Sequence, residues 1–184
     1  MKLKNIKISN YRCFKKAEID FDDHITLVVG KNGAGKTTIL DAVAVSVSTF
    51  LLGIDGGVSR SILKDDARYE FHDLNGTIDP QHQFPVSIES IGDCLNQQNT
   101  KWIRSLNSES GKTTIKDASE LTGLAKKAQN QIMMGDKSLV LPIISYYGTG
   151  RLYAQKKKKR NMKYYNIKNY TLGYNTFGYN FITS

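Results

Sequence analysis

The sequence predicts an α/β fold in which a glycine-rich loop joins a buried strand to a helix with an apolar face. Residues 25–29 form a β-branched apolar run, which is typical of a buried parallel strand. The glycine-rich stretch 30–38 follows at once. Residues 39–51 then carry apolar side chains at helical spacing, which indicates a helix with a wide apolar face. The residues at this spacing are Leu40, Val43, Val47 and Phe50.

An antiparallel hairpin is predicted in front of this unit. Apolar and polar side chains alternate in residues 6–9 and again in residues 17–22, and the turn between them is basic and aromatic. Further strands are predicted at 86–91, around 102–103, and at 139–147, where the residues are apolar enough for a buried strand.

One more helix is predicted in the second half of the chain. Asp117 and Glu120 have the spacing of a capping box, and apolar residues then recur at helical spacing up to a helix end near Gly135.

The glycine-rich stretch fits the phosphate-loop pattern G-x-x-x-x-G-K-[ST], which also requires the strand before it and the helix after it. Glycines let the backbone curl so that successive N–H groups face phosphate oxygens, and the helix N-terminus adds unpaired donors. Lys36 is expected to reach the β- and γ-phosphates of a nucleoside triphosphate, and the Thr37 hydroxyl to ligate Mg²⁺. The candidate binding residues are Gly30, Lys31, Asn32, Gly33, Ala34, Gly35, Lys36, Thr37 and Thr38, with Thr37 as the metal ligand.

Charge is distributed unevenly along the chain. Residues 137–184 hold nine of the 26 basic residues and none of the 17 acidic ones, so they account for the whole formal net charge of +9. Any binding of a polyanion is therefore expected in that region. Two scattered cysteines argue against a disulfide framework and a zinc site, and no run looks long enough to span a membrane. We expect a cytoplasmic protein that does not contact membranes.

Two other stretches invite a catalytic interpretation. The Ser-Gly-Lys-Thr-Thr sequence at 110–114 is not a second phosphate loop, because Leu106 stands where the first glycine is required and no buried strand precedes it. Asp65 and Asp66 could hold a metal or act as acid and base. A polar turn before a strand is the simpler interpretation, since no third ligand is spaced with them.

Residues 3–45 resemble the amino-terminal lobe of ABC-type ATPase heads of the SMC, RecF and overcoming-lysogenization-defect (OLD) group. The resemblance is carried by LKNIKISNYRCFKKAEIDF…ITLVVGKNGAGKTTILDAV, in which an I-x-N-[YF]-[RK] hairpin leads into a G-x-N-G-[AS]-G-K-[ST] loop. It implies that the nucleotide is ATP and that Arg12 lies near it. From the residues alone Arg12 is equally well a solvated turn arginine, and both interpretations stay open.

Residues 102–151 look like a narrower bacterial subset of these ATPases, the stand-alone ATP-binding proteins of virulence-linked loci and of anti-phage systems such as Septu-type and retron-linked ATPases. In ABC-type heads a loop at this place carries a glutamine that contacts Mg²⁺ and water. No glutamine stands at the expected place after Tyr147, so this assignment stays open, and Arg151 is a weak candidate for a phosphate contact.

An ABC-type site also needs an apolar strand ending in Asp-Glu and a serine-glycine signature loop, and neither is visible here. The expectation is an incomplete head: residues 1–154 form the amino-terminal lobe, and residues 155–184 form a basic, tyrosine-rich tail leading toward an absent carboxy-terminal lobe. The catalytic residues are unknown on this interpretation. Such a half is expected to expose apolar surface and to need a partner.

The leading hypothesis is an ATPase that works as a nucleotide-sandwich homodimer. It would gate a nuclease or other effector, or a complex on DNA or RNA, in anti-phage defence. One alternative is a non-catalytic nucleotide- or nucleic-acid-binding module, in which the basic and aromatic tail contacts phosphates and bases; a solvated basic loop is the simpler interpretation of that tail. The other alternative is a small stand-alone phosphotransferase, for which Asp65 and Asp66 are the only candidate carboxylates.

Overall fold

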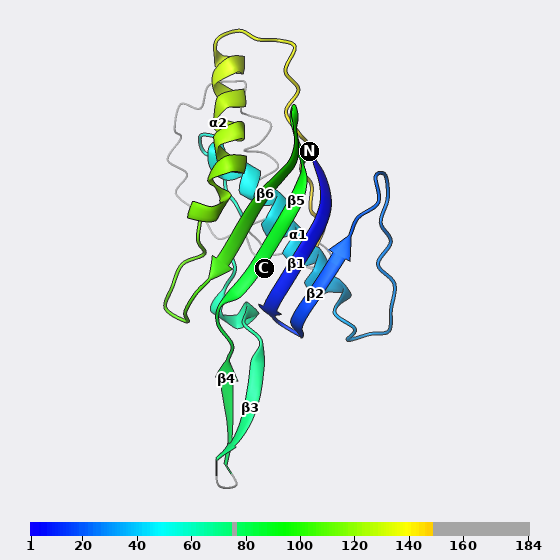
Figure 1. Cartoon of the computed structure of the whole chain (residues 1–184), viewed down its shortest axis with the longest axis vertical. Helices are drawn as coiled ribbons and strands as arrows, with labels where there is room; N and C mark the ends of the chain where they lie inside the picture. The colour runs from blue at the N-terminus through cyan, green and yellow to red at the C-terminus, as the bar shows by residue number, and fades with distance from the viewer. Residues whose placement is uncertain (75–76, 149–184) are drawn as a thin grey trace, which may run out of the picture.

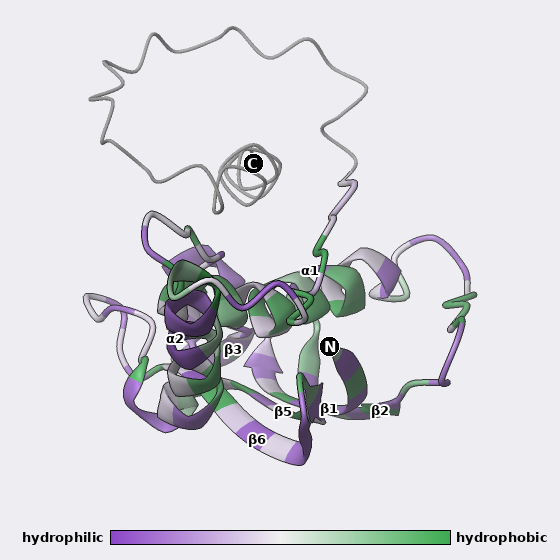
Figure 2. Ribbon diagram, turned by 90° about the horizontal axis from the view of Figure 1, so that it is seen from above, coloured by the Kyte–Doolittle hydropathy of each residue, from purple (hydrophilic) through white to green (hydrophobic). Residues whose placement is uncertain are grey.

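The computed structural model describes residues 1–74 and 77–148. A four-stranded antiparallel sheet in the order β2-β1-β5-β6 forms one layer, and α1 crosses one of its faces with α2 beside it (Figures 1 and 2). A separate two-stranded hairpin, β3-β4, projects beyond the end of the sheet. The elements are β1 (Lys2–Tyr11), β2 (Phe14–Asp20), α1 (Lys36–Ser48), η1 (Thr49–Gly53), η2 (Lys64–Asp66), β3 (Tyr69–Leu74), β4 (Thr77–His82), β5 (Val86–Cys94), β6 (Gln97–Leu106), η3 (Lys116–Ala118) and α2 (Ser119–Met133).

The predicted hairpin is confirmed as β1 and β2. Ile6 pairs with Ile19, and the hairpin closes where Tyr11 pairs with Phe14. On its other edge β1 pairs with β5, and β5 pairs with β6, so the strands predicted at 86–91 and 102–103 are also confirmed. Side chains alternate between the two faces of a strand, and every second residue of β5 is therefore buried under the helices.

The helix α1 packs on the sheet through its small residues. Ala42 and Val45 are fully buried against β1 and β5. The predicted apolar face is only partly the buried one: Leu40, Val43 and Val47 are half-buried or exposed, and of that set only Phe50 is fully buried. Small side chains allow the helix to approach the sheet closely enough for Trp102 Nε1 to donate to the Ser46 carbonyl at 3.1 Å. Close packing therefore determines that α1 turns the face with Ala42 and Val45 toward the sheet.

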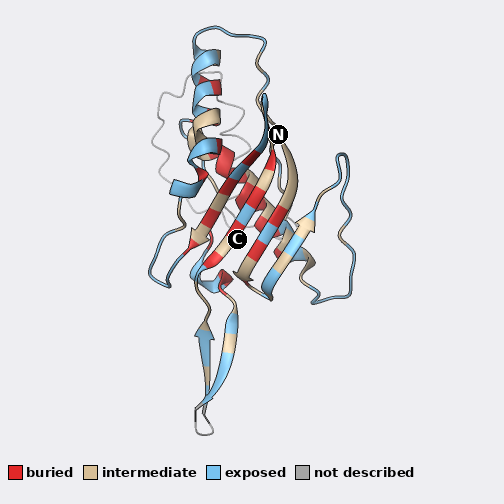
Figure 3. Cartoon of the chain, in the orientation of Figure 1, coloured by how far each residue is buried: buried red, intermediate tan, exposed pale blue. Residues whose placement is uncertain are grey.

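The predicted second helix is confirmed as α2, which packs on η1. Leu121 and Ala125 are fully buried and share a cluster with Phe50 and Trp102. In Figure 3 the buried positions, in red, run across the four-stranded sheet and the helices behind it. The predicted capping box is wrong, because Asp117 lies inside η3 and no side chain caps α2. The preceding 3-10 turn takes up that position instead.

One stretch among the described residues, Lys36–Gly53, is long and apolar enough to cross a membrane by length and composition. The sequence-based expectation that no stretch is long enough to cross a membrane was therefore wrong by length and composition. The stretch covers α1 and η1, and 56% of it is buried inside the fold, as in a core helix packed on a sheet.

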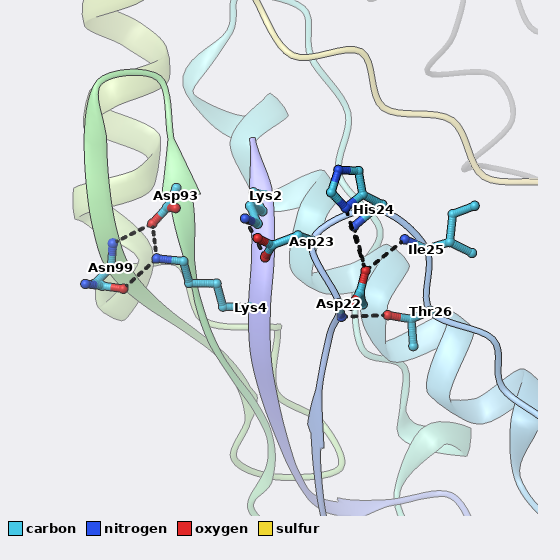
Figure 4. Close-up of polar contacts among 9 residues, drawn as sticks. All are labelled: Lys2, Lys4, Asp22, Asp23, His24, Ile25, Thr26, Asp93 and Asn99. Carbon is cyan, nitrogen blue, oxygen red and sulfur yellow. Dashed lines mark hydrogen bonds and ion pairs between the residues drawn. The ribbon is translucent and has the colours of Figure 1, made fainter.

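Residues 25–29 do not form the predicted strand. Ile25, Leu27 and Val29 are 81%, 80% and 77% exposed. The chain leaves β2 through a turn in which the Asp22 carboxylate accepts hydrogen bonds from the His24 and Ile25 N–H groups, at 2.9 and 3.4 Å (Figure 4). A parallel strand takes its hydrogen bonds from flanking strands, and no described strand lies beside this segment.

The predicted strand at 139–147 is absent for the same reason. Val140 and Ile143 are 83% and 84% exposed, whereas the side chain of Tyr146 reaches α1 and bonds to Asp41. The described residues thus show the exposed apolar surface that we expected, at two segments that each lack a neighbouring strand.

Candidate functional site

The phosphate loop has the backbone conformation that its glycines predict. Gly33 and Gly35 have φ values of 83° and 85°, in the left-handed region that favours glycine. Gly35 is the residue before α1, and the helix begins at Lys36 with no acidic side chain in its first turn. The exposed loop therefore presents a helix N-terminus, with its unpaired N–H donors, to an incoming anion.

Lys36 lies across its own loop. Its Nζ atom donates to the Gly30 carbonyl at 2.7 Å and to the Lys31 carbonyl at 2.8 Å. These bonds use two of the three N–H donors of an ammonium group, which leaves one for a phosphate oxygen. The positive charge is thus held at the mouth of the loop before any nucleotide arrives.

The two threonines after Lys36 face in different directions. Thr37 is exposed, as a metal ligand beside a bound nucleotide has to be. Thr38 is buried toward the β1–β2 turn, with Cys13 Sγ 3.8 Å from its Oγ1 atom. Thr37 is therefore the more exposed of the two threonines, whereas Thr38 lies against the hairpin turn.

The β1–β2 turn packs directly against the loop. An added Cβ at Gly35 would lie 2.6 Å from Phe14 Cζ and 2.8 Å from Cys13 Sγ. Arg12, the residue before Cys13, is consequently placed next to the first turns of α1. Its backbone is also in the left-handed region, with φ 49°, which turns its side chain back toward the helix.

Arg12 is bound by two buried carboxylates, which sequence reasoning did not foresee. Its Nε atom donates to Asp66 Oδ1 at 2.7 Å, and its Nη1 atom bonds to Asp41 Oδ2. Arg12 is therefore not a solvated turn residue, because its guanidinium is paired with carboxylates and only 31% of the side chain is exposed.

Asp66 has a structural task at the same point. It also accepts a hydrogen bond from the Leu63 N–H at 2.9 Å, which closes the turn before β3. The described residues contain no cluster of three His, Cys, Asp or Glu side chains that could hold a metal. The simpler interpretation of Asp65 and Asp66, a polar turn before a strand, agrees with this geometry.

Sequence reasoning missed Asp41, Arg60 and Tyr146. A signal for Asp41 was present, because an acidic residue stands within the apolar helix after the loop. Nothing local marks Arg60 or Tyr146, which come from distant segments. Arg151, the tail 155–184 and the boundary at 154 lie outside the described residues.

The glycine-rich loop lies at the N-terminus of a helix that packs on a sheet, and a basic hairpin turn contacts the loop. This arrangement defines a P-loop nucleotide-binding domain. The chain belongs to the AAA domain family AAA_23, whose profile matches residues 5–175. This membership confirms the predicted α/β P-loop ATPase class and ATP as the nucleotide that the domain binds.

Comparisons with individual proteins agree on this class. The chain is 44% identical over 43 residues to the DNA replication and repair protein RecF of Clostridioides difficile, a match that covers 23% of this chain and 12% of that protein. It is 48% identical over 42 residues to the DNA double-strand break repair Rad50 ATPase of Methanosarcina mazei, which covers 23% and 4% of the two chains. A longer match, 23% identical over 167 residues, joins 90% of this chain to 31% of the Retron Vc95 probable ATPase of Vibrio cholerae.

The chain therefore spans less than a third of the length of each of these curated relatives. Among solved structures, one reported under ATP-driven dimerization and DNA-stimulated activation of SMC ATPases is similar at a TM-score of 0.42 and 16% identity. That match covers 75% of this chain and 93% of the other.

Proposed function

We propose that this chain binds ATP together with Mg²⁺ at residues 30–38, and that nucleotide binding gates a partner. The observation that carries the proposal is the loop itself: two glycines in the left-handed region, a helix N-terminus behind them, and Lys36 Nζ held over the loop by two carbonyls. In this assignment the loop N–H groups and Lys36 bind the phosphates, Thr37 ligates Mg²⁺, and Arg12 adds a second cation at the phosphates.

The domain is proposed to act as one half of a nucleotide-sandwich homodimer in the cytoplasm. The exposed apolar side chains of Ile25, Leu27, Val29, Val140 and Ile143 support an association, because surfaces of this kind are covered in the functional form of most proteins. A nuclease or another effector is the proposed partner. Similarity to the retron ATPase over most of the chain supports a setting in anti-phage defence.

DNA or RNA is proposed as a further partner of the assembly. All the excess positive charge of the chain lies after residue 136, where it could neutralise phosphates. Binding of a single-stranded oligonucleotide by the full chain, compared with a chain lacking residues 155–184 over a series of salt concentrations, tests this part.

Equilibrium binding of ATP to the full chain with Mg²⁺ tests the central proposal. Lys36→Ala is expected to reduce the affinity for ATP by about a hundredfold or more, because a charge-assisted phosphate contact is lost. Lys112→Ala is the matched control, since Lys112 also stands in a Gly-Lys-Thr-Thr sequence but outside a phosphate loop. Equal affinities of wild type and Lys36→Ala would refute the proposal.

Steady-state hydrolysis by the same proteins then separates binding from catalysis. If the catalytic carboxylate is supplied from outside this chain, turnover by wild type is expected to match Lys36→Ala although wild type binds ATP. Turnover well above that blank would show that a catalytic carboxylate lies within these 184 residues.

A further inference from the structure

Asp41 is the centre of a buried polar network below the phosphate loop. It lies on α1 three residues after Thr38 and is 5% exposed. Its Oδ1 atom forms an ion pair with Arg60 Nη1 at 3.1 Å and accepts a hydrogen bond from the Tyr146 hydroxyl. Its Oδ2 atom pairs with Arg12 Nη1. One carboxylate therefore joins the hairpin turn, the segment after η1 and the last described segment of the chain.

The guanidinium of Arg12 is fixed on two sides by this arrangement. Asp66 holds Nε and Asp41 holds Nη1, whereas Nη2 donates to no described residue. The neighbouring Cys13 contacts Thr38 and lies against Gly35, so Arg12 stands beside the loop with N–H donors to spare. A guanidinium that is already immobilised loses less conformational freedom when it binds a phosphate.

The charges of the network favour this arrangement before a nucleotide binds. Two carboxylates, Asp41 and Asp66, face two guanidiniums, Arg12 and Arg60. Arg60 also lies over the Tyr146 ring, 5.4 Å from its centroid, which holds both groups against α1. Burial, together with the hydrogen bond to Asp41, raises the pKa of the Tyr146 hydroxyl, so it remains a donor at neutral pH.

We propose that Asp41 is a positioning residue for phosphate recognition: it holds Arg12 at the loop, and Arg60 and Tyr146 hold Asp41. This inference rests on the proposed binding of ATP at residues 30–38. Asp41 does not touch the nucleotide, and its effect on affinity passes through Arg12. Tyr146 links residues 139–148 to the same point, so the contact between that segment and α1 contributes to affinity.

A double-mutant cycle tests the proposal. The full chain, Asp41→Asn, Arg12→Ala and the double variant are titrated with methylanthraniloyl-ATP and Mg²⁺. Asparagine keeps the shape of Asp41 and removes its charge. Each single substitution is expected to weaken binding about tenfold, the equivalent of one charge-assisted bond, and the double variant to bind no more weakly than Arg12→Ala.

A purely structural role for Asp41 predicts a different result. In that case Asp41→Asn weakens binding by the same factor with and without Arg12, or lowers the melting temperature and leaves the affinity unchanged. Either result overturns the proposal. A wild-type chain with no affinity for the probe, or one unaffected by Lys36→Ala, overturns the proposed function as well, so the two failures are distinguishable.

Tyr146→Phe keeps the test decisive if Asp41→Asn does not fold. It removes only the hydroxyl that orients Asp41. Binding is expected to weaken about threefold in the wild-type background and not at all in the Arg12→Ala background. The same loss in both backgrounds would show that Tyr146 does not act through Arg12, and would overturn the link between residues 139–148 and the site.

Discussion

Gly35 lies directly against the ring of Phe14, so the phosphate loop and the hairpin turn are in contact. A Cβ on Gly35 would lie 2.6 Å from Phe14 Cζ, closer than carbon atoms approach without displacement. The position also has a φ of 85°, which a residue with a Cβ adopts only at a cost. The hairpin therefore restrains the loop through steric contact, and Arg12 ties the same turn to α1 through Asp41.

Gly35→Ala is expected to lower the free energy of unfolding by about 3 kcal/mol, from backbone strain together with the clash. It should also remove ATP binding, because the loop must shift. Urea unfolding and nucleotide titration measure the two effects. Gly33→Ala is the matched control, since Gly33 has φ 83° but nothing within 4 Å of the added Cβ. Its expected loss is about 1 kcal/mol, and equal losses at both positions would contradict the role of Phe14.

The unpartnered hydroxyl of Tyr11 leads to a prediction about pH. Tyr11 is fully buried, and its hydroxyl has no hydrogen-bond partner among the described residues. Burial first, and then the charge of Asp66, raise the pKa of Tyr11 well above its ordinary value of 10.0. The folded state therefore keeps its proton while the unfolded state loses it, so stability falls as the pH rises above 10.

Tyr11→Phe is expected to flatten this loss of stability between pH 10 and pH 11. At pH 8 it should be neutral or stabilise the fold by about 1 kcal/mol, because a buried hydroxyl without a partner is removed. The free energies of unfolding of wild type and Tyr11→Phe, measured at pH 8, 10 and 11, test this prediction. Parallel profiles for the two proteins would show that Tyr11 titrates alike in the folded and unfolded states.

Arg104 is a buried cation without a carboxylate partner among the described residues. It is 2% exposed, and within the described part of the chain its Nη1 atom reaches only the Thr49 and Ser59 hydroxyls, at 3.3 and 3.4 Å. Burial lowers the pKa of its guanidinium to about 10. The buried charge is thus held at a cost in free energy.

Arg104→Met is expected to raise the free energy of unfolding by about 1 kcal/mol, because an apolar chain of similar length replaces an uncompensated charge. Arg60→Met is the comparison, since Arg60 is paired with Asp41, and a loss of about 2 kcal/mol is expected there. Thermal and urea unfolding at pH 7 measure both variants. A large loss at Arg104 would mean that its charge is compensated.

The contact between α2 and η1 depends on the absence of a side chain at Gly53. A Cβ at Gly53 would lie 2.1 Å from the Thr122 carbonyl oxygen and 2.7 Å from the Ala125 Cβ. Gly53→Ala is therefore expected to push α2 away and to cost about 3 kcal/mol. Gly123→Ala, in the interior of α2 with nothing within 4 Å, should instead stabilise the fold by about 1 kcal/mol. Calorimetry of the two variants gives opposite signs if this packing is correct.

The phosphate loop, the β1–β2 hairpin and both helices could be predicted from the sequence, because each depends on residues close together in the chain. Glycines at 33 and 35 determine the loop by their own conformational freedom. Alternation of side chains determines the hairpin, since it needs only a partner a few residues away. The residues that were expected to bind phosphate lie together at the N-terminus of α1 as a direct consequence.

The tertiary structure alone decided which distant residues form ion pairs and hydrogen bonds, and which apolar segments pack against other elements. The segment 25–29 has the composition of a buried strand but no described strand beside it, and composition cannot supply a partner. Arg12 meets Asp41 and Asp66 across 29 and 54 residues of chain, and Tyr146 meets Asp41 across 105. Such contacts follow from the packing of distant elements, which no local pattern in the sequence encodes.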